Sequence, residues 1–333
     1  MASVQFSGVR VAFENLRSHK LRTFLTLLGN IVGTMSVIAV VSLIYGADQY
    51  ARQTVLDEGT DVFTITRVNP WEILTDFDLF LDSLNNPDLT LDDRDWLASR
   101  LEQARAVGAS VSATADLRAG AASYRGAEVR GRTAEYAVIE DLPLALGRHL
   151  TRADLAASRS VAVLGWEVAR ELFPRSPDPV GKEFRLRGRH FTVVGVVEDL
   201  GTVLGNNRNV FVVVPITAWQ KVFGSRASVE IKVAVRDLER FDEAMDEAAF
   251  QMRIRHRLRP LEPNDFGIST AEQLLQIWKG IAGAIYAAMV PLVAISLVIG
   301  GIVLMNVMLV SVTERTREVG VRKAMGADRK SVV

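Results

Sequence analysis

Two long segments without charged residues constrain this chain more than any other feature. They run from Phe24 to Gly46 and from Gly280 to Thr313. A bilayer core about 30 Å thick is crossed by about 20 helical residues, so either segment is long enough to span a membrane. The sequence therefore predicts transmembrane helices at residues 23–46 and 280–312, which flank a large polar region at residues 47–279.

Basic residues next to the two predicted spans indicate their orientation. The cytoplasmic side of a membrane protein carries an excess of Lys and Arg close to its spans. Residues of this kind precede the first span and follow the second: Arg10, Arg17, Lys20, Arg22, Arg315, Arg317, Arg322, Lys323, Arg329 and Lys330. On the other side, only Arg52 and Lys279 lie within about 20 residues of a span. We expect both termini in the cytoplasm and residues 47–279 outside it.

The two flanks of the predicted spans differ in pattern. Residues 1–22 place apolar and charged side chains on separate helical stripes, which predicts an amphipathic segment lying on membrane lipid. An ordinary extension of the first span is the alternative. Residues 313–333 mix both signs of charge, and Glu318 and Arg322 are spaced as an i,i+4 pair. Mixed signs favour contact with a protein surface over binding to anionic lipid, and a solvated helix is the alternative.

The polar region predicts an α+β fold. Strands are expected at residues 61–68, 107–111, 229–235 and 266–269. A helix capped by Thr90 separates the first two strands, and a helix at residues 238–256 separates the last two. Two β-α-β units at the two ends of one region predict a split, porter-like α/β fold. Residues 117–225, which lie between them, are predicted to form an inserted β-rich subdomain, with a hairpin turn at residues 187–190.

One long helix is predicted to join the polar region to the second span. Thr270 and Gln273 form a capping-box pattern, and Pro291 is the one strong helix breaker from there to Val312. Such a helix, about 60 Å long, exceeds the hydrocarbon core, so we expect it to act as a rigid lever with a kink at Pro291.

Composition and motifs exclude several classes of function. The 39 Lys and Arg residues are balanced by 39 Asp and Glu residues, so no basic excess exists to neutralise a nucleic acid. The chain has no cysteine, and its four histidines do not pair at metal-ligand spacing. No P-loop for ATP, no G-x-S-x-G and no H-E-x-x-H motif occurs. We therefore expect no catalytic residue, no cofactor and no metal.

Two further patterns have a possible binding role. Residues 72–88 are acidic and aromatic without a basic residue, which indicates a docking loop or a cation site, with a solvated loop as the alternative. Small and polar residues in the two spans favour close packing between helices, because small residues let backbones approach and amides can form hydrogen bonds in lipid. These residues are Gly29, Asn30, Gly33 and Asn306.

Several motifs together resemble one family, the MacB/FtsX-like ABC permeases. The run Glu314–Ala327 (ERTREVGVRKAMGA) is similar to the segment that follows the second span in that family, and Glu14–Gly29 (ENLRSHKLRTFLTLLG) is similar to the entry into the first span. The polar region resembles the family's periplasmic core domain at Val161–Gly165, Asp178–Lys182, Phe191–Val196 and Ile268–Glu272. The resemblance covers essentially the whole chain.

The resemblance implies a mechanical role in the bacterial inner membrane. A cytoplasmic ABC ATPase, separate or fused, would push on the helix after the second span, and long helices would carry the movement to the outer domain. By position, the residues that face the ATPase would be Glu314, Arg315, Arg317, Glu318, Arg322 and Lys323. The resemblance also implies a homodimer or a paired permease, a periplasmic adaptor as a further partner, and a role in export, efflux or lipoprotein release.

The family pattern has four spans, whereas this sequence ends at Val333 after two. We expect either that the sequence is truncated or that a second chain supplies the other spans. Two other classes of function remain open. A two-span sensor would need a cytoplasmic signalling coiled coil, for which about 20 residues remain. A membrane-tethered enzyme would need a catalytic set of residues that the sequence does not contain.

Overall fold

The chain divides into two compact units, Asp48–Trp278 and the segments before and after it. The structure is a computed structural model. It describes residues 31, 34–49, 59–69, 72–75, 77–203 and 205–326.

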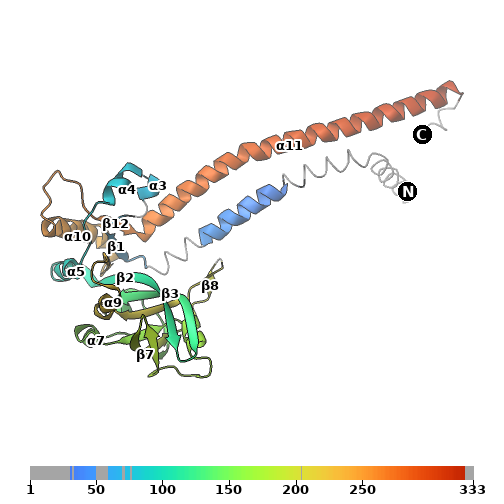
Figure 1. Ribbon diagram of the computed structural model, residues 1–333. Coiled ribbons are helices and arrows are strands. Elements are labelled where there is room, and N and C mark those ends of the chain that lie inside the picture. Colours follow the sequence, from blue (N-terminus) through green and yellow to red (C-terminus); the bar gives the residue numbers. More distant parts are fainter. Residues whose placement is uncertain are drawn as a thin grey trace. The chain divides into compact units, whose positions relative to one another are not determined.

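Helix α11 (Ala271–Ala324) is a single helix of 54 residues that continues through Pro291 (Figure 1). It extends beyond Val312, where the sequence analysis placed the end of the span. Its run Ala271–Ile302 is the one helix within the described residues that is long and apolar enough to cross a membrane. Several large apolar side chains of this run, such as Val290, Ile295 and Val298, are exposed, which is typical of side chains that face lipid.

The predicted first span is described only in part. An apolar helix covers Thr34–Gln49, which is shorter than a span requires. The other residues of the predicted helix at residues 23–46 lie outside the described residues, apart from Ile31. A second span therefore stays a prediction.

The larger unit contains one ten-stranded sheet in the order β12-β1-β11-β2-β3-β10-β5-β7-β4, and β6 pairs with β2 and β7. The strands are β1 (Val62–Thr66), β2 (Ala104–Ala119), β3 (Ala122–Arg132), β4 (Leu144–Gly147), β5 (Val161–Leu164), β6 (Glu183–Leu186), β7 (Arg189–Val197), β10 (Phe211–Pro215), β11 (Glu230–Val235) and β12 (Gly267–Thr270). Strands β8 (Thr202–Val203) and β9 (Asn206–Asn207) form a separate small hairpin.

Helices connect these strands and cover the sheet. They are α3 (Glu72–Thr75), α4 (Phe77–Ser83), α5 (Leu91–Ala98), α6 (Tyr136–Ile139), α7 (Arg152–Ala156), α8 (Trp166–Leu172), α9 (Ile216–Phe223), the 3-10 helix η1 (Leu238–Arg240) and α10 (Phe241–Arg255). The acidic stretch predicted as a loop is therefore helical at α3 and α4, where Phe77 and Phe80 stack with ring centroids 6.3 Å apart.

The split β-α-β arrangement is confirmed. Strands β1 and β2 are both antiparallel to β11, which lies between them, and β11 and β12 are both antiparallel to β1. The unit β1-α5-β2 is therefore interleaved with the unit β11-α10-β12, and α10 packs against α5. Leu97 of α5 and Met252 of α10 are fully buried in the core that these helices share with the sheet. This burial supplies much of the stability of a domain of this kind.

Strand β2 is longer than predicted and connects the two parts of the sheet. The sequence indicated a strand only at residues 107–111, but β2 pairs with β11 at one end and with β3 and β6 farther along. One hydrophobic core runs through both parts, from Phe63 to Phe191. The predicted boundary of the inserted subdomain, residue 117, falls inside β2. The boundaries of this subdomain stay a prediction.

The hairpin β6-β7 has the tight turn expected between two strands. Leu186 pairs with Arg189, so Arg187 and Gly188 alone form the turn. Their φ angles are 47° and 86°, and two successive positive φ angles are the property of a type I′ turn. Strand β7 consequently begins at Arg189, inside the turn that the sequence predicted at residues 187–190.

Candidate functional site

The charged end of α11 places the predicted coupling residues on an exposed helix. Arg317, Glu318, Arg322 and Lys323 are exposed. Glu318 and Arg322 form the expected i,i+4 ion pair, with 3.4 Å between Oε1 and Nη2. Such a pair contributes only about 0.3–0.5 kcal/mol, so both side chains stay available to a partner. Glu314 and Arg315 belong to the same helix, but their side chains lie outside the described residues.

The last turn of α11 ends in the way that its sequence predicts. Gly326 follows the helix with a φ of 87°, and its N–H donates to the carbonyl of Lys323 over 3.2 Å. Arg322 and Lys323 lie in the last turn, where cations are favoured by the helix dipole. The hydroxyl groups of Thr313 and Thr316 donate back to helix carbonyls, so they are not directed at a partner.

The predicted helix-packing residues cannot be placed in the same way. Gly29, Asn30 and Gly33 lie outside the described residues. Asn306 belongs to α11, but its side chain lies outside the described part of that helix. The role of these residues in packing stays a prediction.

The other end of α11 joins directly onto the sheet. The backbone N–H of Thr270 donates to Gln273 Oε1, and the N–H of Gln273 donates to Thr270 Oγ1, both over 3.2 Å. This reciprocal pair is the capping box that the sequence predicted. Because Thr270 is also the last residue of β12, the helix starts where the strand ends. Strand β12 pairs with β1, the first described strand of the larger unit.

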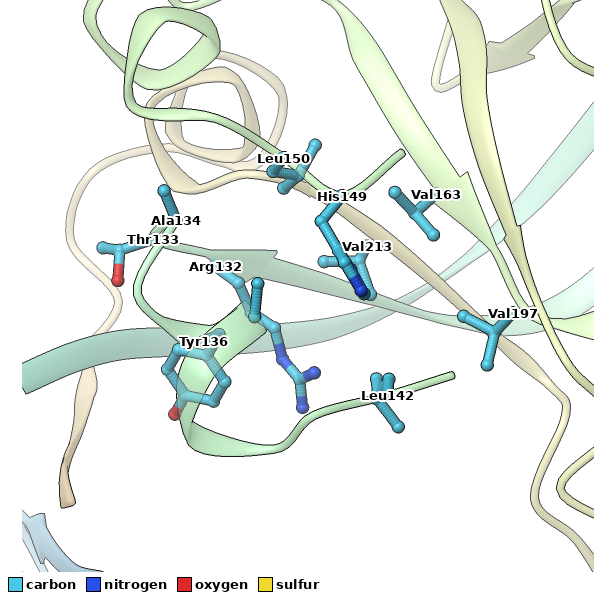
Figure 2. A pocket seen from close by; sticks show the side chains of 11 residues that line it. Arg132, Thr133, Ala134, Tyr136, Leu142, His149, Leu150, Val163, Val197 and Val213 are labelled. Carbon is cyan, nitrogen blue, oxygen red and sulfur yellow. The ribbon is translucent and has the colours of Figure 1, made fainter. Parts of the chain in front are cut away.

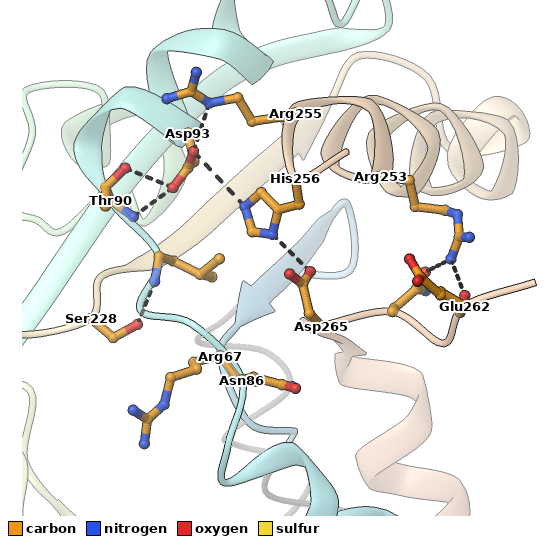
Figure 3. A network of polar contacts seen from close by, with 12 residues as sticks. Arg67, Asn86, Thr90, Asp93, Ser228, Arg253, Arg255, His256, Glu262 and Asp265 are labelled. Carbon is orange, nitrogen blue, oxygen red and sulfur yellow. Dashed lines mark hydrogen bonds and ion pairs between the residues drawn. The ribbon is translucent and has the colours of Figure 1, made fainter. Parts of the chain in front are cut away.

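A polar network holds the segment that leads into β12 (Figure 3). Asp93 accepts hydrogen bonds from the N–H and the hydroxyl of Thr90 and from Arg255 Nε, over 2.8, 2.7 and 2.9 Å. His256 contacts Asp265 with 2.7 Å between Nδ1 and Oδ1. Burial alone raises the pKa of Asp93, but the hydrogen bonds from Thr90 and Arg255 outweigh it, so the pKa lies below its usual value. The network thus joins α5, α10 and the approach to α11.

Arg253 fixes the loop between α10 and β12. Its guanidinium donates to the carbonyls of Arg259 and Glu262 and to Asn264 Oδ1, the last over 2.6 Å (Figure 3). The capping role of Thr90 was evident from sequence. The roles of Arg253 and Asp265 were not, since nothing in their local pattern indicates that the chain folds back onto the end of α10.

We expect Asp93→Ala to lower the free energy of unfolding of the larger unit by about 2 kcal/mol, because a helix cap and a buried ion pair are lost together. Asp92, an exposed carboxylate in the same helical turn, gives the matched control Asp92→Ala, with an expected loss below about 0.5 kcal/mol. Denaturant titration followed by tryptophan fluorescence measures both. Equal losses in the two variants would contradict the assignment.

A buried ion cluster connects the two parts of the sheet. Arg132, at the end of β3, binds both oxygens of Glu140 over 2.8 and 3.0 Å. Lys232 of β11 lies 3.3 Å from the same carboxylate. Beside it is a small cavity of about 30 Å³, lined by Arg132, Tyr136 and His149 among others (Figure 2). A cavity of this size has room for water and not for a substrate. Within the described residues, no group of three or more His, Asp and Glu side chains is arranged to hold a metal.

Family models match most of the chain. A model described as MacB-like periplasmic core domain matches residues 23–249, and one described as FtsX-like permease C-terminal matches residues 291–333. The chain is 31% identical to a macrolide export ATP-binding/permease protein MacB of Rhodospirillum rubrum, over 100% of this chain and 49% of the relative. A protein of the same name in Aggregatibacter actinomycetemcomitans is 31% identical over 97% of this chain and 48% of the relative. The chain thus spans about half the length of these relatives.

Solved structures share the fold. The periplasmic region of MacB from Actinobacillus actinomycetemcomitans superposes with a TM-score of 0.55 at 23% identity, over 68% of this chain and 96% of that one. The extracellular domain of the ABC-type transporter YknZ from Gram-positive bacteria superposes with a TM-score of 0.50 at 18% identity, over 63% of this chain and 100% of that one. At such identities the likeness concerns the fold alone.

Proposed function

Because this chain belongs to the family of proteins with a MacB-like periplasmic core domain, we propose that it is the membrane subunit of an ABC-type exporter, in which it transmits the movement of a cytoplasmic ATPase to the outer domain. ATP hydrolysis belongs to a partner ATPase in this proposal, because residues 1–333 contain no P-loop.

The observation that carries the proposal is the continuity of α11. One hydrogen-bonded helix runs from the last residue of a sheet strand, Thr270, through an apolar stretch to the charged residues that end at Lys323. A helix transmits an axial displacement because each peptide unit is bonded to the next turn. At about 1.5 Å per residue its 54 residues cover about 80 Å, which exceeds the thickness of a bilayer.

The ATPase contact is proposed to be the charged end of α11, formed by Glu314, Arg315, Arg317, Glu318, Arg322 and Lys323. Both signs of charge occur in this set, which suits a protein surface with complementary charges. We propose that this end is cytoplasmic, as the N-terminus is, and that residues 47–279 are extracytoplasmic, since the excess of basic residues flanks the termini.

The remaining partners are proposed from the family. A second copy or a paired permease would pack through the helices that contain Gly29, Gly33, Asn30 and Asn306. A periplasmic adaptor would contact the outer domain. The exported molecule would not pass through this subunit, which would instead drive export, efflux or lipoprotein release by moving the outer domain.

The test is capture of the ATPase from native membrane with the full-length chain, in the presence of ATP-γ-S, followed by mass spectrometry. We expect a P-loop ATPase with the natural chain and at least about a tenfold loss with Arg322→Glu, Lys323→Glu, because two reversed charges at a contact cost more than the about 1.4 kcal/mol of a tenfold change.

The matched control, Arg175→Glu with Arg226→Glu, changes two exposed arginines of the larger unit. This variant is expected to capture the ATPase normally. Absence of an ATPase from every sample would reject the proposed function. Equal capture by both double variants would support an ATPase as the partner but would show that Arg322 and Lys323 are not its contact.

A further inference from the structure

A second candidate site lies within the larger unit, Asp48–Trp278, far along the chain from the charged end of α11. It is an open cleft of about 660 Å³. One wall comes from α5 and the start of β2, with Arg94 and Arg105, and from Arg236 after β11. The rest of the lining includes Glu135, in the segment before α6, and Arg152 of α7.

The lining combines basic groups with an apolar surface. Its four arginines face a single lining carboxylate, that of Glu135. Small and apolar side chains lie between them: Ala98, Leu101, Ala104, Ala106, Val107, Ala134, Val138 and Leu155. A cleft of this size and composition binds ligands that have an apolar body and a few well-placed polar groups. The lining therefore favours an anionic ligand with apolar parts.

The four arginines keep donors available for such a ligand. Arg94, Arg105 and Arg152 form ion pairs of 3.0, 2.9 and 3.0 Å with Asp95, Asp61 and Glu135, respectively. Each of these contacts uses one nitrogen of a guanidinium that carries five N–H donors. The carboxylates of Asp61 and Asp95 are not part of the cleft lining. Arg152 is 86% exposed, so the greater part of its guanidinium faces solvent.

Among the residues that the structure describes, one cation of the lining lacks a compensating carboxylate, and one guanidinium keeps an unsatisfied donor. The Nε of Arg236 donates to a backbone carbonyl, that of Ala104, over 3.0 Å, so no described carboxylate compensates this cation. The Nε of Arg94 is buried and has no hydrogen-bond partner among the described residues. An unpaired donor in the wall of a polar cleft is unfavourable until an acceptor reaches it.

The arginines also fall into two pairs, which indicates more than one acidic group on the ligand. Arg94 and Arg152 both act on Glu135, through charge and through a hydrogen bond. Arg105 and Arg236 both lie at the start of β2, where Arg236 binds the carbonyl of Ala104. Separate guanidinium pairs match separate carboxylates, because an arginine binds a carboxylate with two parallel hydrogen bonds.

We propose that this cleft binds an acidic, partly apolar peptide segment of a partner or cargo polypeptide in the extracytoplasmic space. The carboxylates of the segment pair with the two arginine pairs, and its apolar side chains cover the alanine and leucine residues between them. This site goes beyond the coupling role, since all its residues belong to the unit Asp48–Trp278. Only the extracytoplasmic location of its ligand rests on the proposed function.

The test measures binding of a fluorescent peptide of alternating glutamate and leucine to the full-length chain in nanodiscs of neutral lipid. Fluorescence anisotropy gives the Kd, and empty nanodiscs correct for partition into lipid. We expect saturable binding that weakens as salt screens the charges, and at least about tenfold weaker binding of a glutamine–leucine peptide.

The decisive variant is Arg105→Gln with Arg152→Gln, both at exposed or half-exposed positions, which should raise the Kd about tenfold or more. The control Arg175→Gln with Arg226→Gln removes the same charge from exposed positions outside the cleft and should leave the Kd within about twofold. Thermal midpoints of both variants verify that the domain is folded.

Three results would overturn the proposal: equal binding of the glutamine peptide, equal Kd values for the two double variants, or no saturable binding. Displacement of the peptide by about 1 mM inorganic phosphate, at the ionic strength of a chloride control, would assign the cleft to a free phosphate group instead of a peptide. The ATPase capture experiment with Arg322→Glu, Lys323→Glu does not measure peptide binding. The two proposals can therefore fail independently of each other.

Discussion

Glu140→Ala is expected to lower the free energy of unfolding of the larger unit by about 4 kcal/mol, because it leaves two buried cations without their carboxylate. The side chains of Arg132, Lys232 and Glu140 are only 8%, 9% and 12% exposed. Burial alone raises the pKa of Glu140, but Arg132 and Lys232 outweigh it and hold the pKa below its usual value. The carboxylate is therefore charged at neutral pH.

Denaturant titration measures this loss, with Trp219 as the probe. Its ring is buried, stacks on Phe223 with centroids 4.7 Å apart, and donates to the carbonyl of Val129. The control is Glu128→Ala, which removes a carboxylate that is 41% exposed and paired with Arg130, and which should cost less than about 1 kcal/mol. A loss no larger than that of the control would mean that the cluster does not hold the two parts of the sheet together.

The second large effect is expected at Asp154, which is fully buried and accepts hydrogen bonds from Arg148, from both the N–H and the hydroxyl of Thr151, and from Arg159. Asp154→Ala should cost about 3 kcal/mol at neutral pH, because it removes the cap of α7 and leaves Arg148 without its partner. The hydrogen bond from Arg148, more than any other contact, lowers the pKa of Asp154 from 3.8 to about 2.

This pKa makes the contribution of Asp154 dependent on pH. The folded-state pKa is depressed, so the stabilisation is fully present above the unfolded-state value of 3.8 and is lost as pH falls toward about 2. A shift of this size corresponds to about 2 kcal/mol. In Asp154→Asn, a side chain of the same shape that does not titrate, the difference in stability from the natural chain should shrink between pH 4 and pH 2. A difference that stays constant across that range would contradict the assigned pKa.

Local sequence patterns predicted the elements that depend on neighbouring residues. The helix cap at Thr90 and the capping box of Thr270 and Gln273 were evident because each depends on residues a few positions apart. The two interleaved β-α-β units followed from strand and helix signals in the correct order.

Features that depend on distant residues were not evident. In the cluster of Arg132, Glu140 and Lys232, the last two are 92 positions apart, which no local pattern indicates. The true length of β2 was missed because its second half alternates half-buried alanines with exposed polar residues, and its partners β3 and β6 decide its pairing. For the coupling residues, the sequence predicted the charged helix, and the exposure of Arg322 agrees with it, but the partner surface stays a prediction.

The edge of the sheet at β12 has a mechanical property that follows from its register. Phe63 pairs with Thr270 and Thr66 with Gly267, so the start of β1 and the end of β12 lie at the same end of one antiparallel pair. Hydrogen bonds in such a pair are perpendicular to the strands. A pull directed along β12 through Ala271 therefore loads them together in shear, whereas a pull across the strand would break them one after another. The direction in which α11 moves would thus decide whether the hydrogen bonds between β1 and β12 resist the force together or break in sequence.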